Sequence, residues 1–262
     1  MHVLWSGPMI TIAVAMQKGG SGKTTSTVNL AAALAELGKR VLVVDSDSQG
    51  NASNWLAIKE PDHGLFGVLC EGSKASEAIR RSDAEGVAVD VIPASPWLVG
   101  AERALMAEVG AETILRRKLK EVAGQYDICI IDCPPTLGLL TVGALVASDY
   151  VLAPCAAHIL SLEGLAQLTS TIETVTDRLN ENLKLLGIVA CRVDVRTRHG
   201  VEVTEELRRR FQSEVFNAVI RESVRLAECP SFGTSIFGYD PKGSGASDYR
   251  ALANELLERL NA

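Results

Sequence analysis

The chain has 262 residues, a length that fits one large α/β domain or at most two small ones. With 47% hydrophobic and 22% charged residues it can bury a sizeable core, and the formal net charge of −6 argues against a protein that binds nucleic acid with its whole surface. The six cysteines are scattered without a C-x-x-C pair, and the longest uncharged apolar run, residues 137–148, is too short to cross a bilayer, so we expect a cytoplasmic protein.

Short β-branched apolar runs alternate with longer helical segments along the chain. Strands are predicted at residues 10–16, 41–45, 87–93, 127–132, 150–154, 185–192 and 215–220. Helices are predicted at residues 24–37, 101–109, 112–122, 137–147, 162–179, 203–211 and 247–260. Because the strands are nearly continuous apolar runs, we predict an α/β fold, with a mostly parallel twisted sheet and helices on both faces. No Pro/Gly-rich linker is present, so one domain is expected over residues 1–262, with residues 1–8 as an N-terminal extension if Met9 is the start.

A glycine-rich loop lies between the first predicted strand and the first helix. It reads Lys18-Gly19-Gly20-Ser21-Gly22-Lys23-Thr24-Thr25. Glycines let backbone N–H groups converge on a phosphate, and the start of the next helix adds its dipole. Lys23 supplies positive charge to the β- and γ-phosphates, and the Thr24 hydroxyl can bind Mg²⁺. Gln17 stands where the general pattern has its first glycine, and Lys18 is a second lysine. The sequence therefore predicts a P-loop NTPase of the deviant Walker A type.

Three acidic residues follow predicted strands and complete this site. Asp45 and Asp47 come at the end of the second strand, and Asp132 ends the apolar run that starts at Ile128. In a parallel sheet these ends lie at the edge where ligands bind, and such acids can orient an attacking water or hold Mg²⁺. An Asp at a strand end is also a common turn former, but three of them beside a phosphate loop favour a role in the site. Cys133 has no partner nearby in sequence and is interpreted as structural.

These motifs are similar to those of the ParA/MinD family, and most similar to short, Soj-like ParA proteins that partition chromosomes and plasmids. The resemblance covers most of the chain. It is carried by residues 18–25, 45–51, 132–135, 162–165, 224–228, 230–231, 239–241 and 245–246. It implies ATP and Mg²⁺ as cofactors and a homodimer that closes over ATP.

The resemblance also assigns roles to single residues of the loop and of the acidic set. Lys18 would cross the dimer interface to the partner's ATP, and Lys23 would bind the β- and γ-phosphates. Thr24 would ligate Mg²⁺, and Asp132 would hold the metal through water. Asp47 would position the hydrolytic water. Lys18, Lys23 and Asp47 are therefore the predicted catalytic residues.

Some positions depart from the usual family pattern. Ser48 stands where proline is usual, and His158 stands where an acid is common. Arg221-Glu222-Ser223 replaces a Pro-Arg-Asn segment near the adenine and the DNA face. Glu222 thus puts a negative charge where the family pattern has a positive one.

Residues 192–225 hold eight arginines and six acidic residues in an otherwise acidic chain. Arg196 and Arg225 match the arginines with which the family binds double-stranded DNA without sequence preference. The alternative is a solvated helix face, in which Arg208–Arg210 form ordinary surface pairs with Glu205 and Glu206. Few aromatic residues lie nearby, so stacking of single-stranded bases is not supported.

Three other functions remain open beside a DNA-partitioning ATPase that a ParB-like centromere-binding protein stimulates. A MinD-like membrane ATPase needs a basic amphipathic C-terminal helix, whereas residues 251–260 are acidic, so we expect this helix to pack on the domain and expect no membrane partner. An iron–sulfur ATPase needs converging cysteines, and Cys129 and Cys133 are poorly spaced for that. A ParA-like ATPase that positions a cargo other than DNA would share all of the ATPase motifs.

Overall fold

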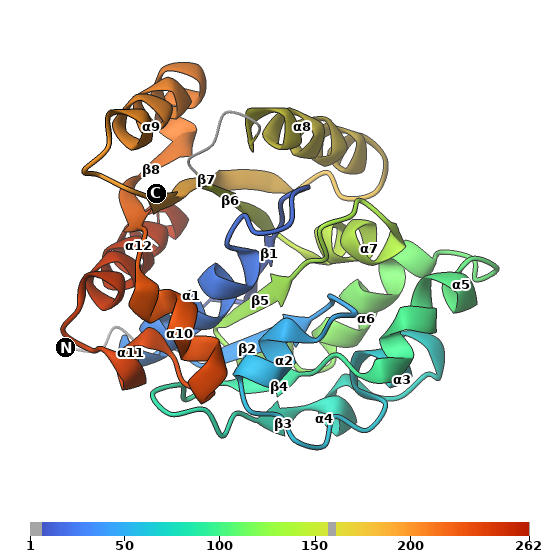
Figure 1. The fold of residues 1–262 in the computed structure, drawn as a ribbon. Helices are drawn as coiled ribbons and strands as arrows, with labels where there is room; N and C mark the ends of the chain where they lie inside the picture. Colours follow the sequence, from blue (N-terminus) through green and yellow to red (C-terminus); the bar gives the residue numbers. More distant parts are fainter. Residues whose placement is uncertain (1–6, 157–160, 262) are drawn as a thin grey trace.

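The computed structural model describes residues 7–156 and 161–261, which form an eight-stranded sheet in the order β3-β4-β2-β5-β1-β6-β7-β8 (Figure 1). The strands are β1 (Ile10–Val14), β2 (Val41–Asp45), β3 (Arg80–Arg81), β4 (Asp90–Ile92), β5 (Ile128–Asp132), β6 (Tyr150–Ala156), β7 (Lys184–Val193) and β8 (Val215–Arg221). Every neighbouring pair is parallel except β3, which is antiparallel to β4 at the edge. The predicted mostly parallel α/β sheet is confirmed.

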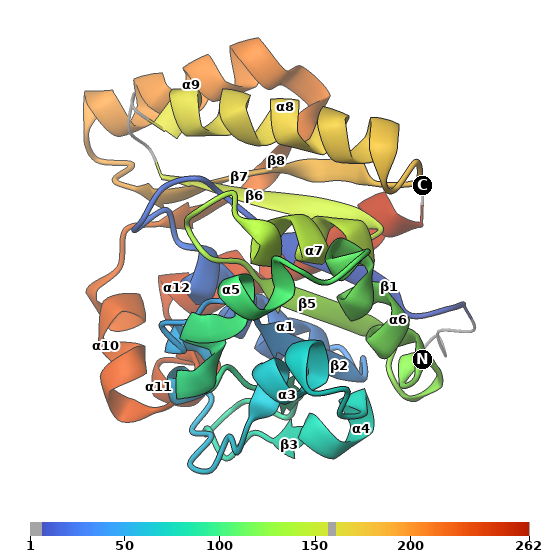
Figure 2. The same ribbon diagram turned by 90° about the vertical axis from the view of Figure 1, so that its right-hand side faces the viewer.

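Helices cover both faces of this sheet (Figures 1 and 2). They are α1 (Lys23–Glu36), α2 (Asn51–Trp55), α3 (Gly64–Cys70), α4 (Ala75–Ala78), α5 (Ala101–Leu105), α6 (Ile114–Lys120), α7 (Leu139–Ala147), α8 (Ser161–Arg178), α9 (Arg198–Phe211), α10 (Val224–Phe232), α11 (Ile236–Tyr239) and α12 (Ser244–Leu260). Helices α3–α9 pack on one face, and α1, α2 and α10–α12 pack on the other. The central strands β2, β5 and β1 are therefore buried on both sides, which explains their continuous apolar sequences.

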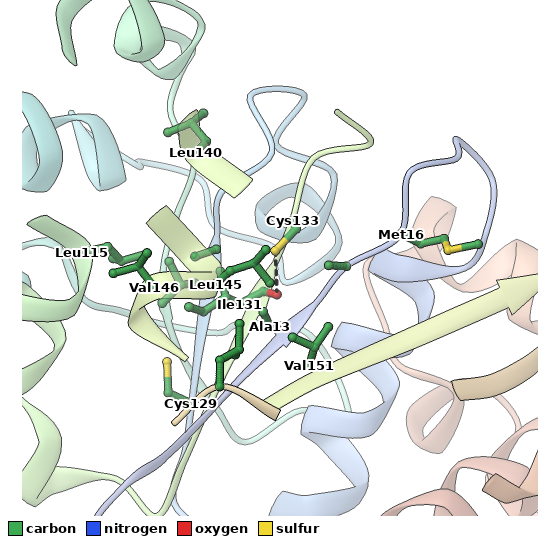
Figure 3. Close-up of a cluster of buried hydrophobic side chains, with 14 of the residues drawn as sticks. Ala13, Met16, Leu115, Cys129, Ile131, Cys133, Leu140, Leu145, Val146 and Val151 are labelled. Carbon is green, nitrogen blue, oxygen red and sulfur yellow. Dashed lines mark hydrogen bonds between the residues drawn. The ribbon is translucent and has the colours of Figure 1, made fainter. Parts of the chain in front are cut away.

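The two cores follow from the alternation of side chains along each strand. Ala13 of β1 lies in the first core, whereas its neighbours Ile12 and Val14 lie in the second. Figure 3 shows part of the first core, where Ala13 and Val151 lie close to Leu145 of α7. All of these side chains are buried, and complete burial of a leucine or valine stabilises the fold by roughly 1.5–3 kcal/mol.

Several predicted boundaries were wrong. The strand predicted at residues 87–93 shortens to β4, because Gly86, at φ 71°, and the bond from the Val87 N–H to the Ala84 carbonyl form a turn before it. The helix predicted at residues 101–109 ends as α5 at Leu105, and the side chains of Met106 and Val109 are exposed. The short helices α2–α4 and α11 and the strand β3 were not predicted, since elements of this length depend on tertiary packing. Helix α10 was also not predicted, and it contains Pro230, a residue that argues against a helix in a sequence.

The C-terminal helix α12 packs on the domain, as expected. Leu252 and Leu256 are buried against the second core. Glu255 on the same helix accepts the N–H groups of Asn217 and Ala218 at 2.9 and 2.8 Å, next to the middle of β8. The acidic residue thus caps strand N–H groups that would otherwise lack a partner. Among the described residues, no helix is both long enough and apolar enough to cross a membrane.

Candidate functional site

The phosphate loop and the predicted acids meet at the carboxyl edge of the sheet. Strand β5 lies between β1 and β2, and its last residue, Asp132, is in register with Val14 on one side and Asp45 on the other. The loop that leaves β1 and the acidic turn that leaves β2 therefore flank Asp132. The three acids gather at one edge, which is the position that the sequence predicted for them.

The loop itself has the shape of an anion-binding turn. Gly20 and Gly22 have φ values of 71° and 95°, which only glycine adopts without strain, and Gly22 is the N-cap residue of helix α1. A Cβ atom added to Gly19 or Gly20 would meet no protein atom within 4 Å, so the space beside the loop is open. Within the part of the chain that the structure describes, the buried oxygens Gln17 Oε1 and Ser21 Oγ have no hydrogen-bond partner. An open glycine turn with an unsatisfied hydroxyl at a helix start fits a phosphate group.

Lys23 is buried at the start of α1 and points back along the loop. The residue is 7% exposed, and Nζ donates to the carbonyl oxygen of Lys18 at 3.3 Å. Burial lowers the pKa of Lys23, although the nearby carboxylate of Asp132 works in the opposite direction. A phosphate in the loop would favour the charged ammonium further. Lys18 is half-buried, and its backbone carbonyl accepts this bond from Lys23.

Asp132 is fully buried and accepts two hydroxyl hydrogen bonds from α1. Thr24 Oγ1 lies 2.8 Å from Oδ2, and Thr27 Oγ1 lies 3.1 Å from Oδ1. Burial raises the pKa of Asp132, and the charge of Asp45 raises it further. A hydroxyl and a carboxylate at this distance form the hard oxygen set that suits Mg²⁺. Thr27 was missed, but its spacing of three residues from Thr24 on one helix face could have revealed it.

The other two acids differ in their surroundings. Asp45 is fully buried and accepts the backbone N–H and the hydroxyl of Ser53 at 2.7 and 2.6 Å, as well as the N–H of Asp47 at 3.2 Å. Asp47 accepts the N–H of Gln49 at 3.0 Å through Oδ1, and its Oδ2 takes no hydrogen bond from the described residues. Asp45 therefore holds the turn in place, whereas one oxygen of Asp47 is available to a ligand or a water molecule.

A cavity of about 330 Å³ runs from the phosphate loop to the ends of β7 and β8. It is lined by Gly20, Gly22, Thr25, Cys191, Arg192, Ile220, Arg221, Glu222, Ser223, Leu226, Ala227 and Tyr249. The side chains of Ile220, Leu226 and Tyr249 are buried and give it apolar walls. The size and the walls suit the nucleoside of a nucleotide whose phosphates lie in the loop. The family resemblance placed residues 221–223 near the adenine, but no motif marks the apolar wall residues Ile220, Leu226 and Tyr249, which were not predicted.

The two predicted DNA-binding arginines lie beyond the same edge of the sheet. Arg196 follows β7 and Arg225 is in the first turn of α10, after the neighbouring parallel strand β8. Arg196 forms two bonds with Asp194, at 2.9 and 3.0 Å, and Arg225 pairs with Glu228 at 3.4 Å. These side chains are 84% and 61% exposed, and such exposed pairs typically contribute only about 0–1 kcal/mol. An anion in solution can therefore displace either acid at low free-energy cost.

The structure also shows the surroundings of other arginines of this segment and of the positions that depart from the family pattern. Arg209 and Arg210 both pair with Glu206, as the alternative of a solvated helix face predicted. Glu222 pairs with Arg192, so its negative charge is locally balanced. Ser48 is half-buried in the turn after β2, and His158 lies outside the described residues.

The two cysteines of the β5 region are buried in the first core. Burial raises the pKa of both Cys129 and Cys133, which favours the thiol over the thiolate. Figure 3 shows the thiol of Cys133 directed at the carbonyl oxygen of Ile131, at 3.8 Å. These properties agree with the structural interpretation of Cys133.

Comparison with known proteins places this geometry in a family. The AAA domain family matches residues 9–185. The chain is 44% identical over 247 residues to the sporulation initiation inhibitor protein Soj of Bacillus subtilis, covering 94% of this chain and 97% of Soj. It is 43% identical to the chromosome partitioning protein ParA of Myxococcus xanthus, with 97% and 90% of the two chains covered. The chain belongs to the ParA/MinD family of P-loop ATPases.

A solved structure extends the similarity to three dimensions. Cobyrinic acid a,c-diamide synthase from Mycobacterium smegmatis, with bound ADP and magnesium, superimposes with a TM-score of 0.85 at 34% identity, and covers 97% of this chain and 96% of its own. The family model and the two relatives confirm the family resemblance read from the loop and the acids, and this superposition agrees with the predicted fold. The roles of the individual site residues stay predictions.

Proposed function

We propose that this chain is a DNA-partitioning ATPase: it closes as a homodimer over ATP, binds double-stranded DNA without sequence preference, and is released when a ParB-like centromere-binding protein stimulates ATP hydrolysis. The observation that carries the proposal is the joint placement of Lys23, Thr24 and Asp132 beside an open glycine loop. It is supported by identities above 40% to two proteins named for chromosome partitioning or sporulation control. The protein would act in the cytoplasm, on the nucleoid when ATP is bound.

Each predicted site residue would have its own role in ATP binding and hydrolysis. The backbone of residues 18–25 and the ammonium of Lys23 would hold the phosphates, and Lys18 would reach the partner subunit's ATP. The Thr24 hydroxyl and the Asp132 carboxylate would hold Mg²⁺, directly and through water, and the ion would neutralise phosphate charge. The free oxygen of Asp47 would orient the attacking water. Arg196 and Arg225 would contact DNA phosphates.

Slow hydrolysis is expected without a partner protein. Phosphoryl transfer depends on full positioning of water and charge, and Lys18 acts on a second subunit in this scheme. A single copy of the chain therefore holds an incomplete site. Stimulation by a partner would then consist of stabilising the closed arrangement.

The test is DNA binding at several salt concentrations, with ATP, with ADP and without nucleotide, each with Mg²⁺. We expect DNA binding to require ATP. The logarithm of the binding constant should fall linearly with the logarithm of the salt concentration. Equal binding in all three nucleotide states would contradict the proposal. Anionic liposomes in place of DNA serve as the comparison for a MinD-like activity, and nucleotide-dependent dimerisation without DNA binding would favour a cargo other than DNA.

A further inference from the structure

Two threonine hydroxyls of helix α1 bond to a carboxylate outside their own helix. Helix α1 lies against β5 (Figure 1), and Thr24 and Thr27 both donate to Asp132 at the end of that strand. A threonine inside a helix commonly donates to the carbonyl oxygen four residues earlier. Four threonines of α8 and α9 do so, namely Thr169, Thr171, Thr174 and Thr204. The direction of the Thr27 hydroxyl therefore reflects a contact with the site and not the local preference of a helix.

Thr27 bonds to one particular oxygen of Asp132. Its Oγ1 donates to Oδ1 at 3.1 Å, whereas Thr24 Oγ1 donates to Oδ2 at 2.8 Å. Thr27 is almost one helical turn farther from the phosphate loop than Thr24, so Oδ1 is engaged on the side away from the loop and Oδ2 on the side toward it. Thr27 and Asp132 are both 0% exposed, so bulk water does not compete for their bond. Donors on both oxygens hold the carboxylate against rotation.

The main chain of Asp132 is fixed as well. The residue is in register with β1 on one side and with β2 on the other. Its carbonyl oxygen accepts the N–H of Ser46 at 3.0 Å and the hydroxyl of Ser46 at 2.7 Å. With the main chain held, the orientation of the carboxylate depends on the bonds from Thr24 and Thr27. Thr24 would itself bind the ion in the proposed function, so Thr27 is the residue that acts through the carboxylate.

We infer that Thr27 is a positioning residue that sets the metal preference of the site: it holds Oδ1 away from the phosphate loop, so that Asp132 presents only Oδ2 toward the ion. The inference rests on the proposed function, in which Thr24 and Asp132 hold Mg²⁺. Mg²⁺ keeps several water molecules in a strict octahedron, whereas Ca²⁺ takes about six to eight oxygens and often binds both oxygens of a carboxylate. A carboxylate limited to one oxygen therefore favours Mg²⁺ over Ca²⁺.

The test is calorimetric titration of the full chain with a non-hydrolysable ATP analogue in EDTA, in Mg²⁺ and in Ca²⁺. The gain in nucleotide affinity over EDTA measures how well the site accepts each ion, without any turnover. In the unmodified protein Mg²⁺ should give the larger gain. Thr27→Val keeps the shape of the side chain but removes the donor, so it should reduce the gain from Mg²⁺ by about 10-fold, as the loss of a bond that orients a metal ligand typically does. The gain from Ca²⁺ should stay the same or rise, and the affinity in EDTA should be unchanged.

Matched variants separate the lost bond from the change in the side chain. Thr27→Ser keeps the donor and should keep the preference for Mg²⁺. Thr204→Val makes the same substitution at a buried threonine of α9, whose hydroxyl bonds within its own helix, and should also keep the preference. Thermal unfolding shows whether each variant folds. If Thr27→Val does not fold, Thr27→Cys replaces it, because a thiol is a weaker donor and should lose part of the preference.

Three results would overturn the inference while leaving phosphate binding intact. One is an unchanged gain from Mg²⁺ in Thr27→Val, or in Thr27→Cys where that variant replaces it. Another is an equal reduction for both ions, which would mean that Thr27 supports Asp132 without selecting the ion. The third is an unmodified protein that gains equally from Mg²⁺ and Ca²⁺. If the analogue does not bind to the unmodified protein in any condition, the proposed ATPase function itself fails and the inference fails with it.

Discussion

The phosphate-loop site and the arginine segment, residues 192–225, contain charged residues at the same edge of the sheet but hold them in opposite ways. In the phosphate-loop site the charges of Lys23, Asp45 and Asp132 are buried, and each contacts a group fixed by the backbone or by a neighbouring helix. In the arginine segment, Arg196 and Arg225 are exposed and pair with acids two or three residues away. Burial makes the first set rigid and selective, whereas exposure leaves the second set exchangeable.

This difference predicts two kinds of response to mutation. Removing one member of a buried network leaves its partner unsatisfied, which costs about 1–3 kcal/mol and more for a charge. Removing one exposed arginine changes only part of the electrostatic potential that several charges produce together, and salt screens the effect. The phosphate-loop site should therefore respond in an all-or-none manner and the arginine segment in a graded one.

Lys23→Ala is expected to have the largest effect. Lys23 is the buried cation of the loop, so its loss should weaken ATP binding by at least about 100-fold, as expected for the loss of a charge-assisted contact in a water-poor site. Equilibrium titration with a fluorescent ATP analogue measures this. Lys59→Ala removes an exposed lysine and should bind normally. Retention of ATP affinity in Lys23→Ala would contradict the assignment of the loop.

Asp47→Ala should separate binding from hydrolysis. Because one oxygen of Asp47 is unengaged by the described residues, its loss should leave nucleotide affinity near normal and lower kcat by about 100-fold or more. The variant should accumulate as an ATP-bound dimer. Phosphate release and size-exclusion chromatography with ATP test both expectations, with the exposed Asp83→Ala as the control. Normal hydrolysis would remove Asp47 from this role.

Arg225→Glu tests the graded response expected of the arginine segment. Reversing this charge in both subunits of a dimer should weaken DNA binding by about 10-fold at moderate salt and reduce the slope of log K against log salt. ATP-dependent dimerisation should persist, because Arg225 does not line the nucleotide cavity. Arg81→Ala on the edge strand β3 is the control. Unchanged DNA affinity with an unchanged salt slope would move the DNA contact elsewhere on the surface.

The phosphate-loop site could be predicted far better from sequence than the cavity next to it. Binding a triphosphate through backbone N–H groups requires glycines and a lysine in fixed order, so residues 18–25 carry their chemistry in their spacing. The parallel sheet then brings Asp132 and Asp45 together without further information. Ser53, which fixes Asp45, comes from a five-residue helix that forms only in the folded chain.

Apart from residues 221–223, which the family resemblance placed near the adenine, the nucleoside cavity could not be predicted, for a physical reason. Arg192 reaches the cavity because β7 has one residue more than its pairing with β8 accommodates. A bulge depends on the register of two strands, and no local pattern in residues 184–193 indicates it. The family resemblance identified Glu222 as unusual, but its pairing with Arg192 followed only from the structure.

Stability should depend on pH through the buried acids. Burial raises the folded-state pKa of Asp132, so the folded state holds a proton that the unfolded chain releases near pH 4. This contribution to stability is complete below pH 4 and is lost as pH rises through the folded-state pKa. The nucleotide-free protein should therefore lose about 1 kcal/mol or more between pH 5 and pH 8. Denaturant unfolding measures the loss. Asp132→Asn should reduce the dependence of stability on pH, and the part that remains should come from Asp45, whose pKa is also raised by burial.

The smallest expected effect is that of Glu222→Gln on DNA affinity. Glu222 lies where the phosphate-loop site and the arginine segment meet, so this variant tests the boundary between them. Glu222 lines the nucleotide cavity and also neutralises Arg192 in the arginine segment. The substitution removes one negative charge and weakens the hold on Arg192, so DNA affinity with ATP should rise about two- to fourfold, an effect that salt should suppress. Glu214→Gln makes the same charge change at an exposed site outside the cavity. An equal rise in both variants would mean that only net charge matters, whereas a rise confined to Glu222→Gln would mean that Arg192, once freed, itself contacts DNA.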